Sequence, residues 1–519
     1  MSKRMICHLA LLLFAIPSVA QTRVITAQYN NLRTNANIKE TILTPSNVVV
    51  TKFGKLFSHS VDGAIVGQSL YLPGVSIPGK GTHNVVYAAT MHDSVYAFDA
   101  DTNSGTNAVP LWRTRVLPSG ATPVPISVQG AGGVTGWTEV GVVSTPVIDA
   151  ETGILYVVAK DYLHGIVSNR LHGLNVATGV EAFTPILIAA SFASGGKTYV
   201  FNNLSQVNRP ALLLVSGVLY IGFGSNGIAN GKGYQQGWIL AYSAKTFSSG
   251  VKLLGAFNNE PGKGSGGIWQ TGGGLSADLT GNVYAETADG PFIAGTNFGQ
   301  SILKLTLNRG LHLTDWFTPY NWAALRKSDL DLTISPLILP TQSGAHPYLA
   351  IGVGKEGTIY VLDRTNMGHL CTTCTHGDTQ IAQELPGALG HARGMILSFA
   401  YWNETVYTSH PGWPIKAWTL NGGLLPSTPT IESNVSCFCH SGVVSANGNG
   451  NAILWELGGT ESDAQLLAFD ATTLQQIYSA RQAGTRDLLP PAAHFAKLME
   501  VHGKVYVGTN STLAVFGLL

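Results

Sequence analysis

Charged residues are scarce in this 519-residue chain. Asp, Glu, Lys and Arg together make up 11% of it, and the formal net charge is +1, whereas an average domain has roughly 25% charged residues. A protein that binds nucleic acid needs a cluster of Lys and Arg to neutralise the phosphates. We therefore expect no nucleic-acid partner.

Long apolar stretches are also missing after the first 20 residues. At the N-terminus, Lys3 and Arg4 precede an apolar run from Leu9 to Ile16 and the small-residue pattern Ser18-Val19-Ala20. A membrane anchor is the alternative, but a spanning helix needs roughly 20 apolar residues, about twice this run. The pattern predicts a signal peptide over residues 1–20. We expect a secreted or periplasmic protein with no integral membrane segment.

What the chain does have is glycine, with 61 residues, and a repeated pair of apolar strands. The first pair is VVYAAT followed by VYAFDA. An aromatic residue marks the first strand of each copy, at intervals of about 50 to 70 residues, a period typical of repeat architectures. The eight markers are Tyr87, Tyr156, Tyr220, Tyr284, Tyr348, Tyr407, Trp455 and Tyr506.

Each marker strand has an apolar strand before it and one after it, and a looser fourth strand follows. Eight four-stranded antiparallel units predict an all-β, eight-bladed β-propeller, because each blade then covers its neighbour's apolar face. A β-solenoid, two β-sandwiches or a seven-bladed ring are the alternatives. The last unit lacks its fourth strand, and the segment Lys52 to Val61 has no unit of its own. We predict that this segment completes the last blade and closes the ring.

The predicted organisation is a signal peptide (1–20), an N-terminal extension (21–51) and a single propeller domain (52–519). The segments YAFDADT (Tyr96 to Thr102) and LLAFDATT (Leu466 to Thr473) resemble the repeat of quinoprotein-dehydrogenase-like propellers, which is named after pyrroloquinoline quinone (PQQ). YNNLRTNAN (Tyr29 to Asn37), GKEGTIYVLDRTNMGH (Gly354 to His369) and HGKVYVGT extend the resemblance to exported bacterial PQQ-repeat-like propellers. The resemblance implies the fold more than the chemistry.

The connections between blades are long and open on one face, which we take as the functional face. They place a set of polar and aromatic residues beside the central channel, where a planar or hydroxyl-rich ligand would dock. Hydrogen bonding between blades is the alternative role for each of them. The predicted ligand-binding residues are Glu139, Arg209, Trp269, Gln270, Asp331, His391, Arg393, His440 and His494.

The four cysteines of the mature chain form two close pairs, Cys371 with Cys374 and Cys437 with Cys439. In an oxidising compartment an even number of cysteines favours disulfides. A shared four-thiolate metal site is disfavoured because the two pairs belong to loops that open on opposite faces. We predict two local disulfides. We expect no metal site, because the histidines lack the short spacing typical of zinc ligands.

Two functions fit these observations. The first is an exported propeller that binds a small molecule, a saccharide or a protein at the between-blade face. The alternative is a PQQ-dependent dehydrogenase acting on alcohols or sugars, with PQQ and calcium as cofactors. For that family the resemblance implies adjacent cysteines, whereas Phe438 separates Cys437 from Cys439. No catalytic residue is identified, no lipase-type elbow or P-loop is present, and we leave open whether the protein is an enzyme.

Overall fold

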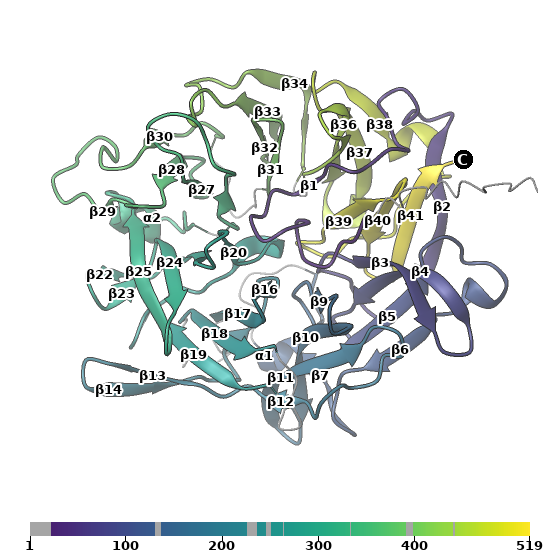
Figure 1. Ribbon diagram of the computed structural model, residues 1–519, viewed down its shortest axis with the longest axis horizontal. Coiled ribbons are helices and arrows are strands. Elements are labelled where there is room, and N and C mark those ends of the chain that lie inside the picture. The colour runs from purple at the N-terminus through teal and green to yellow at the C-terminus, as the bar shows by residue number, and fades with distance from the viewer. Residues whose placement is uncertain are drawn as a thin grey trace, which may run out of the picture.

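A ring of eight antiparallel blades surrounds a central axis (Figure 1). This computed structural model describes residues 22–129, 136–225, 236–244, 251–262, 264–332, 334–390, 398–439 and 442–519, so the predicted signal peptide lies outside the described residues. The eight-bladed propeller predicted from the repeats is confirmed. No helix in the described ranges is long and apolar enough to cross a membrane.

The first four blades follow the chain from residue 70 to residue 318. From the axis outward, blade 1 consists of β3 (Leu70–Ile77), β4 (Gly81–Ala89), β5 (Ser94–Asp99) and β6 (Trp112–Arg115). Blade 2 consists of β9 (Val147–Asp149), β10 (Ile154–Leu163), β11 (Ile166–Asn175) and β12 (Ile186–Leu187). Blade 3 consists of β16 (Leu213–Val215), β17 (Val218–Ser225), β18 (Trp238–Ser243) and β19 (Leu253–Asn258). Blade 4 consists of β20 (Ser276–Ala277), β21 (Val283–Glu286), β24 (Ile302–Leu307) and β25 (Leu311–Thr318).

The other four blades complete the circle. Blade 5 consists of β26 (Leu337–Ile338), β27 (Leu349–Val353), β28 (Ile359–Asp363) and β30 (Gln383–Leu385). Blade 6 consists of β31 (Ser398–Trp402), β32 (Thr405–Ser409), β33 (Trp413–Thr419) and β34 (Ile431–Cys437). Blade 7 consists of β35 (Val443–Asn447), β36 (Gly450–Gly458), β37 (Gln465–Asp470) and β38 (Gln476–Ser479). Blade 8 consists of β39 (Leu498–Val501), β40 (Lys504–Gly508), β41 (Thr512–Leu518) and the N-terminal strand β2 (Phe53–Ser60).

Short strands and helices lie within the connections between these strands. They include the hairpins β13–β14 (Ser191–Ser194, Lys197–Val200) and β22–β23 (Phe292–Ile293, Asn297–Phe298), the strands β7 (Thr122–Pro125), β8 (Glu139–Val140) and β15 (Gln206–Val207), and the helices α1 (Ile126–Gln129) and α2 (Trp322–Lys327). The loop between β28 and β30 crosses to blade 4, where its strand β29 (His369–Leu370) pairs in parallel with β25. Cys371 is bonded to Cys374 in this loop, and Cys437 is bonded to Cys439 after β34.

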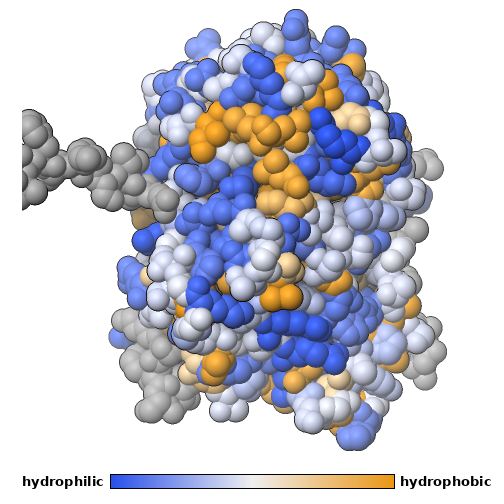
Figure 2. Space-filling view, turned by 90° about the vertical axis from the view of Figure 1, so that its right-hand side faces the viewer, coloured by the Kyte–Doolittle hydropathy of each residue, from blue (hydrophilic) through white to orange (hydrophobic). Residues whose placement is uncertain are grey.

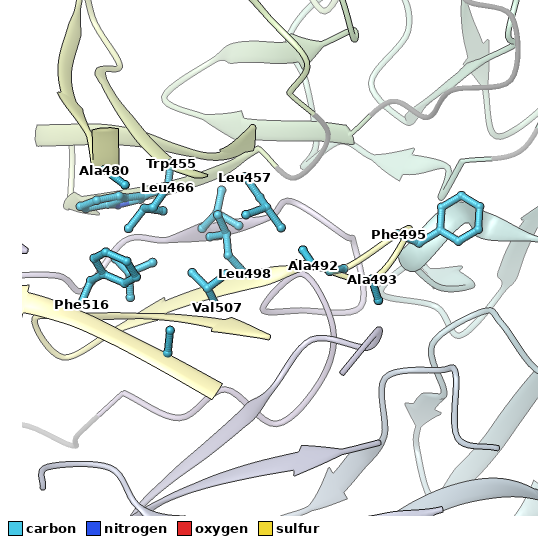
Figure 3. Close-up of a cluster of buried hydrophobic side chains, with 14 of the residues drawn as sticks. Trp455, Leu457, Leu466, Ala480, Ala492, Ala493, Phe495, Leu498, Val507 and Phe516 are labelled. Carbon is cyan, nitrogen blue, oxygen red and sulfur yellow. The ribbon is translucent and has the colours of Figure 1, made fainter. Parts of the chain in front are cut away.

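The ring closes as the sequence predicts. Strand β2 pairs antiparallel with β41, with Phe53 opposite Leu518 and Ser60 opposite Thr512. Phe53 is fully buried, and its ring packs against Trp455 (5.4 Å between centroids) of blade 7 and against Phe516 (6.3 Å) of β41. Figure 3 shows Trp455 and Phe516 within the cluster that joins blades 7 and 8. The N-terminal strand therefore seals the joint between the first and last parts of the chain.

The rim beside this joint keeps some apolar side chains at the surface. Leu56, Leu518 and Leu519 are 37%, 38% and 59% exposed. The view of this side shows apolar patches among polar residues (Figure 2). Scattered exposed leucines are normal on protein surfaces, and a charged residue, Lys55, stands next to Leu56 on the edge strand, where a charge discourages pairing with another chain.

The aromatic marker of the repeat has a structural reason. In several blades its hydroxyl group donates a hydrogen bond to a main-chain carbonyl just beyond the third strand of the next blade. The bonds join Tyr87 to Val176, Tyr156 to Ala244, Tyr407 to Ala471 and Tyr506 to Ala100, at 2.6 to 3.0 Å. The last of them links blade 8 to blade 1. A tyrosine supplies both a flat apolar body and a polar end for such a site.

The N-terminal residues 24–40 pass through the middle of the ring (Figure 1). They hydrogen-bond to the innermost strand of every blade, and we call this segment the plug. The strand residues that make these bonds, from blade 1 to blade 8, are Tyr71, Ile148, Leu214, Ala277, Ile338, Tyr401, Val444 and Glu500. Within the plug, strand β1 (Ala36–Asn37) pairs in parallel with β35. The plug therefore ties all eight blades together at the axis.

A buried pair of carboxyl groups anchors the end of the plug to blade 8. Glu40 accepts hydrogen bonds from the amides of Leu43 and Gly503, and Glu500 accepts one from the Asn37 side chain. Burial, and then the nearby Glu40, raise the pKa of Glu500 well above its ordinary value. The pKa of Glu40 is lowered because hydrogen bonds, one of them from Glu500, outweigh its burial. Glu500 is therefore protonated at neutral pH and donates to ionised Glu40.

This arrangement predicts a pH-dependent stability difference between the native chain and Glu500→Gln. The unfolded chain loses the Glu500 proton near pH 4.5, but the folded chain retains it, so this group progressively destabilises the fold as the pH rises above that value. Gln cannot ionise and keeps both hydrogen bonds. We expect the melting temperature of Glu500→Gln, relative to the native chain, to rise as the pH increases above 4.5. A pH-independent difference would contradict the assignment.

Candidate functional site

Arg209, Trp269 and a residue that the sequence analysis did not single out, Phe495, form a stack at the axis. The Arg209 guanidinium carbon lies 4.5 Å from the Trp269 ring centroid and 4.4 Å from that of Phe495. Its Nε also donates to the Trp269 carbonyl (3.2 Å). Burial lowers the pKa of Arg209 to about 9, and Asp331 acts in the opposite direction. The three side chains come from the connections before blades 3, 4 and 8.

The connection before blade 8 crosses the axis to make this stack. Figure 3 shows its residues Ala492 and Ala493 leading from the core of blades 7 and 8 toward Phe495. Phe495 also contacts Trp137, from the connection before blade 2 (6.2 Å between ring centroids). A Cβ atom on Gly272 would lie within 3 Å of Lys497 and of the Phe495 carbonyl. Side chains therefore fill the axis at this level, where the sequence analysis expected an opening.

The other predicted site residues divide into three groups. Glu139 is 3.0 Å from His92 of the β4–β5 turn, Gln270 is buried and donates to the Glu286 carbonyl (3.1 Å), and the His494 ring packs against Phe495 at 4.0 Å. Glu139 and Gln270 therefore bond to other segments of the chain, whereas His494 contacts the next residue of its own loop. His391, Arg393 and His440 lie outside the described residues. Asp331 belongs to a polar cluster in which a neighbouring carboxylate is open to solvent.

That cluster contains three carboxylates and one ammonium group. Asp289 follows β21 of blade 4, Asp329 and Asp331 follow α2 in the connection to blade 5, and Lys355 lies in the β27–β28 turn. Lys355 Nζ is 2.9 Å from Asp329 Oδ1 and forms an ion pair with Asp331. The side chain of Asp329 is 74% exposed and that of Asp331 is 5% exposed. We call these four residues the carboxylate cluster.

The three carboxyl groups of the carboxylate cluster differ in their pKa values. Burial, and then repulsion from Asp331, raise the pKa of Asp289 to about 9. Burial raises the pKa of Asp331 against the attraction of Lys355. Burial also acts to raise the pKa of Asp329, but hydrogen bonds from Asp289 and Lys355 lower it. At neutral pH, protonated Asp289 therefore faces ionised Asp329, so the cluster offers both hydrogen-bond donors and acceptors.

The carboxylate cluster is also the one group of potential metal ligands found among the described residues. One oxygen from each of Asp289, Asp329 and Asp331 lies within 4.8 Å of the others, and carboxylate oxygens are ligands for hard cations such as Ca²⁺. A cation would replace the proton on Asp289. One signal for this cluster is visible in the sequence, the Asp-Leu-Asp spacing of Asp329 and Asp331. Asp289 and Lys355 join them only through the packing of blades 4 and 5.

Neighbouring residues occupy the space where a planar cofactor would stack on the Trp269 ring. Arg209 covers its ring, and the main chain of Gly224 and Gly267 lies so close that a Cβ atom on either glycine would clash with the indole. The described residues therefore fit a cation, but they do not fit a quinone stacked on Trp269 in this arrangement.

Comparisons with known proteins show that this chain shares its fold with solved structures. No known family and no curated protein matches the sequence. Among solved structures, the quinohemoprotein alcohol dehydrogenase from Comamonas testosteroni is 15% identical with a TM-score of 0.63, and the match covers 96% of this chain and 80% of that one. A quinohemoprotein alcohol dehydrogenase from Pseudomonas putida HK5 is 15% identical (TM-score 0.61, 96% and 80% covered).

A europium-containing methanol dehydrogenase is 13% identical with a TM-score of 0.60, and the match covers 96% of this chain and 98% of that one. The predicted resemblance to quinoprotein propellers is confirmed at the level of the fold. At these identities the likeness carries no residue roles.

Proposed function

We propose that this protein is exported and binds a small, hydroxyl-rich ligand at the between-blade face of blades 4 and 5. The observation that supports this function is the convergence of Asp289, Asp329, Asp331 and Lys355, from loops of two blades, at a place where Asp329 is open to solvent. Loops that a rigid scaffold holds together are common binding sites. The predicted signal peptide supports the export.

The chemistry of the carboxylate cluster suits hydroxyl groups. Ionised Asp329 accepts a hydrogen bond, while Lys355 and protonated Asp289 donate them. A sugar or polyol carries several hydroxyl groups that both donate and accept. Hydrogen bonds to charged groups contribute roughly 1.5–3 kcal/mol each to the free energy of an interaction. A ligand that bonds to two of these residues would gain the contribution of both bonds.

The test is calorimetric titration of sugars and polyols into the native chain and Asp329→Asn. We expect one class of these compounds to bind, and we expect the substitution to weaken binding about tenfold or more. The melting temperature stays nearly unchanged because Asp329 is exposed. Asp463→Asn is the matched control, since Asp463 is an exposed partner of Arg481 elsewhere on the ring. Equal binding by Asp329→Asn would refute the proposed site.

A PQQ-dependent oxidoreductase is the second candidate. It is favoured by the three carboxylates, which fit a cation, and by the fold shared with a quinohemoprotein alcohol dehydrogenase and a methanol dehydrogenase. The covered Trp269 ring and the separated cysteines argue against it. Incubation with PQQ and Ca²⁺, followed by desalting, decides between the two. A retained visible chromophore with alcohol-dependent dye reduction would establish the oxidoreductase, and a colourless, inactive protein would exclude it.

A further inference from the structure

Glu356, the residue after Lys355, lines a separate pocket on blade 5. The pocket has a volume of about 310 Å³, at the lower end of the range of small-molecule sites. It lies between the β27–β28 turn, the fourth strand β30, the start of α2 and the disulfide-containing loop before β30. The side chains that matter for its chemistry are Tyr320, Asn321, Glu356, Thr358, His376 and Glu384.

The polar groups of this pocket mainly accept hydrogen bonds. Glu356 Oε1 accepts from the Tyr360 hydroxyl (2.6 Å), and Glu384 Oε2 accepts from the Asp378 amide (2.5 Å). Thr358 Oγ1 accepts from the amide of Gly387. Glu356, Glu384 and Asp378 form no ion pair with a Lys, Arg or His among the residues that the structure describes. The pocket therefore carries negative charge without a protein counter-charge.

One acceptor in the wall has no partner at all. Asn321 Oδ1 is buried, and no donor of the described residues reaches it. Buried polar atoms in proteins nearly always have a hydrogen-bond partner. Asn321 also lines the pocket, but its Oδ1 is enclosed by protein, so the acceptors that a ligand can reach are the carboxylates.

The carboxylates repel one another. Burial, followed by repulsion from Glu384 and Glu356, raises the pKa of Asp378 to about 6, although its hydrogen bond from Gln380 acts in the other direction. Burial and repulsion from Glu356 raise the pKa of Glu384 as well. A cation in the pocket would relieve this repulsion and favour the ionised forms.

The spacing of the ligands decides which kind of cation fits. The carboxylate cluster of blades 4 and 5 is the one set of three metal-ligating groups within 4.8 Å found among the described residues. The groups of the blade 5 pocket are therefore spread too widely for one metal ion to contact three of them. An organic cation with an ammonium group at each end does not need three ligands around one point, and Tyr320, a side chain with an apolar body, is among the residues that line the pocket.

We propose that the blade 5 pocket binds a small organic diamine, with Glu356 and Glu384 accepting hydrogen bonds from its ammonium groups. The full-length native protein is titrated with 1,4-diaminobutane at pH 7.5 in low salt. We expect saturable binding of one molecule. The uncharged 1,4-butanediol, which has the same length, is expected not to bind because it cannot neutralise the carboxylates.

Conservative variants locate the site. Glu356→Gln and Glu384→Gln keep the acceptors for Tyr360 and Asp378, so both fold, and each is expected to weaken diamine binding about tenfold or more. Glu151→Gln removes an exposed charge far along the chain on blade 2 and should leave binding unchanged. Asp329→Asn should also leave it unchanged, which separates this pocket from the carboxylate cluster and the function proposed for it.

The pH dependence gives a further readout. Between pH 7 and pH 5, Asp378, with a pKa of about 6, gains a proton. The negative charge beside the pocket then decreases, so the diamine affinity should fall. Absence of binding at pH 7.5, equal binding of butanediol, or the same loss of affinity in Glu151→Gln would overturn the proposal. Ca²⁺ binding that depends on Glu356 and Glu384 in place of diamine binding would overturn it too.

Discussion

Arg33→Ala is expected to lower the free energy of unfolding by about 3–5 kcal/mol, which is among the largest effects of any single substitution in this chain. Arg33 is fully buried in the plug. Its Nε donates to the Leu275 carbonyl (2.8 Å) and its Nη1 to the Ala27 carbonyl (2.6 Å) and Thr26 Oγ1 (3.0 Å). Burial lowers the pKa of Arg33 to about 9. Alanine leaves these acceptors without donors and creates a cavity at the axis.

The measurement is a denaturant titration of the native chain, Arg33→Ala and two comparison variants. Arg33→Lys is expected to recover little stability, because an ammonium group cannot reach acceptors on several sides as the planar guanidinium does. Arg23→Ala is the control, since Arg23 is exposed at the start of the same segment. If Arg33→Ala unfolds at the same denaturant concentration as Arg23→Ala, the plug does not stabilise the ring.

Phe53→Ala is expected to cost about 3–5 kcal/mol as well, through a cavity at the ring-closing joint. Phe53 packs on Trp455, Phe516 and, edge to face at 5.0 Å, on Tyr478. Leu56→Ala on the same strand is the matched control, because Leu56 is partly exposed and its loss should cost much less. The two variants are compared by denaturant titration.

Hydrogen exchange shows where the effect of Phe53→Ala acts. We expect faster exchange of the amides of β2 and β41, which pair with each other, while the amides of blades 3 to 5 keep their native protection at low denaturant. Uniformly faster exchange around the ring would mean that the joint is no weaker than the other blade contacts.

The sequence predicts the ring well because its signal is local and repeated. An aromatic residue at each marker position and apolar strands on both sides of it recur eight times, and strand pairing follows from that order. Even the closing strand Lys52 to Val61 is identifiable, since the last repeat lacks its fourth strand. The plug escapes prediction because its bonds to the blades are made one residue at a time, so residues 24–40 show no periodicity.

The candidate site is predicted only in part. The sequence predicts Asp331 as a ligand-binding residue. Its partners Asp289 and Lys355 belong to other connections, and their spacing from Asp331 matches no known motif. Arg209 and Trp269 do meet at the axis, but the third member of their stack, Phe495, comes from the connection before blade 8. Contacts of this kind depend on the paths of long loops, and hydrophobic periodicity contains no information about those paths.

The plug also fixes the order in which the molecule can be completed. Residues 24–40 are synthesised before all eight blades, but their eight partners are spread from Tyr71 to Glu500, and β2 must wait for β41. While the chain is being synthesised, the blades that bind the plug are still incomplete. The plug therefore cannot make all its bonds before blade 8 is synthesised, and in a chain that is interrupted before blade 8 the strand β2 lacks its partner β41.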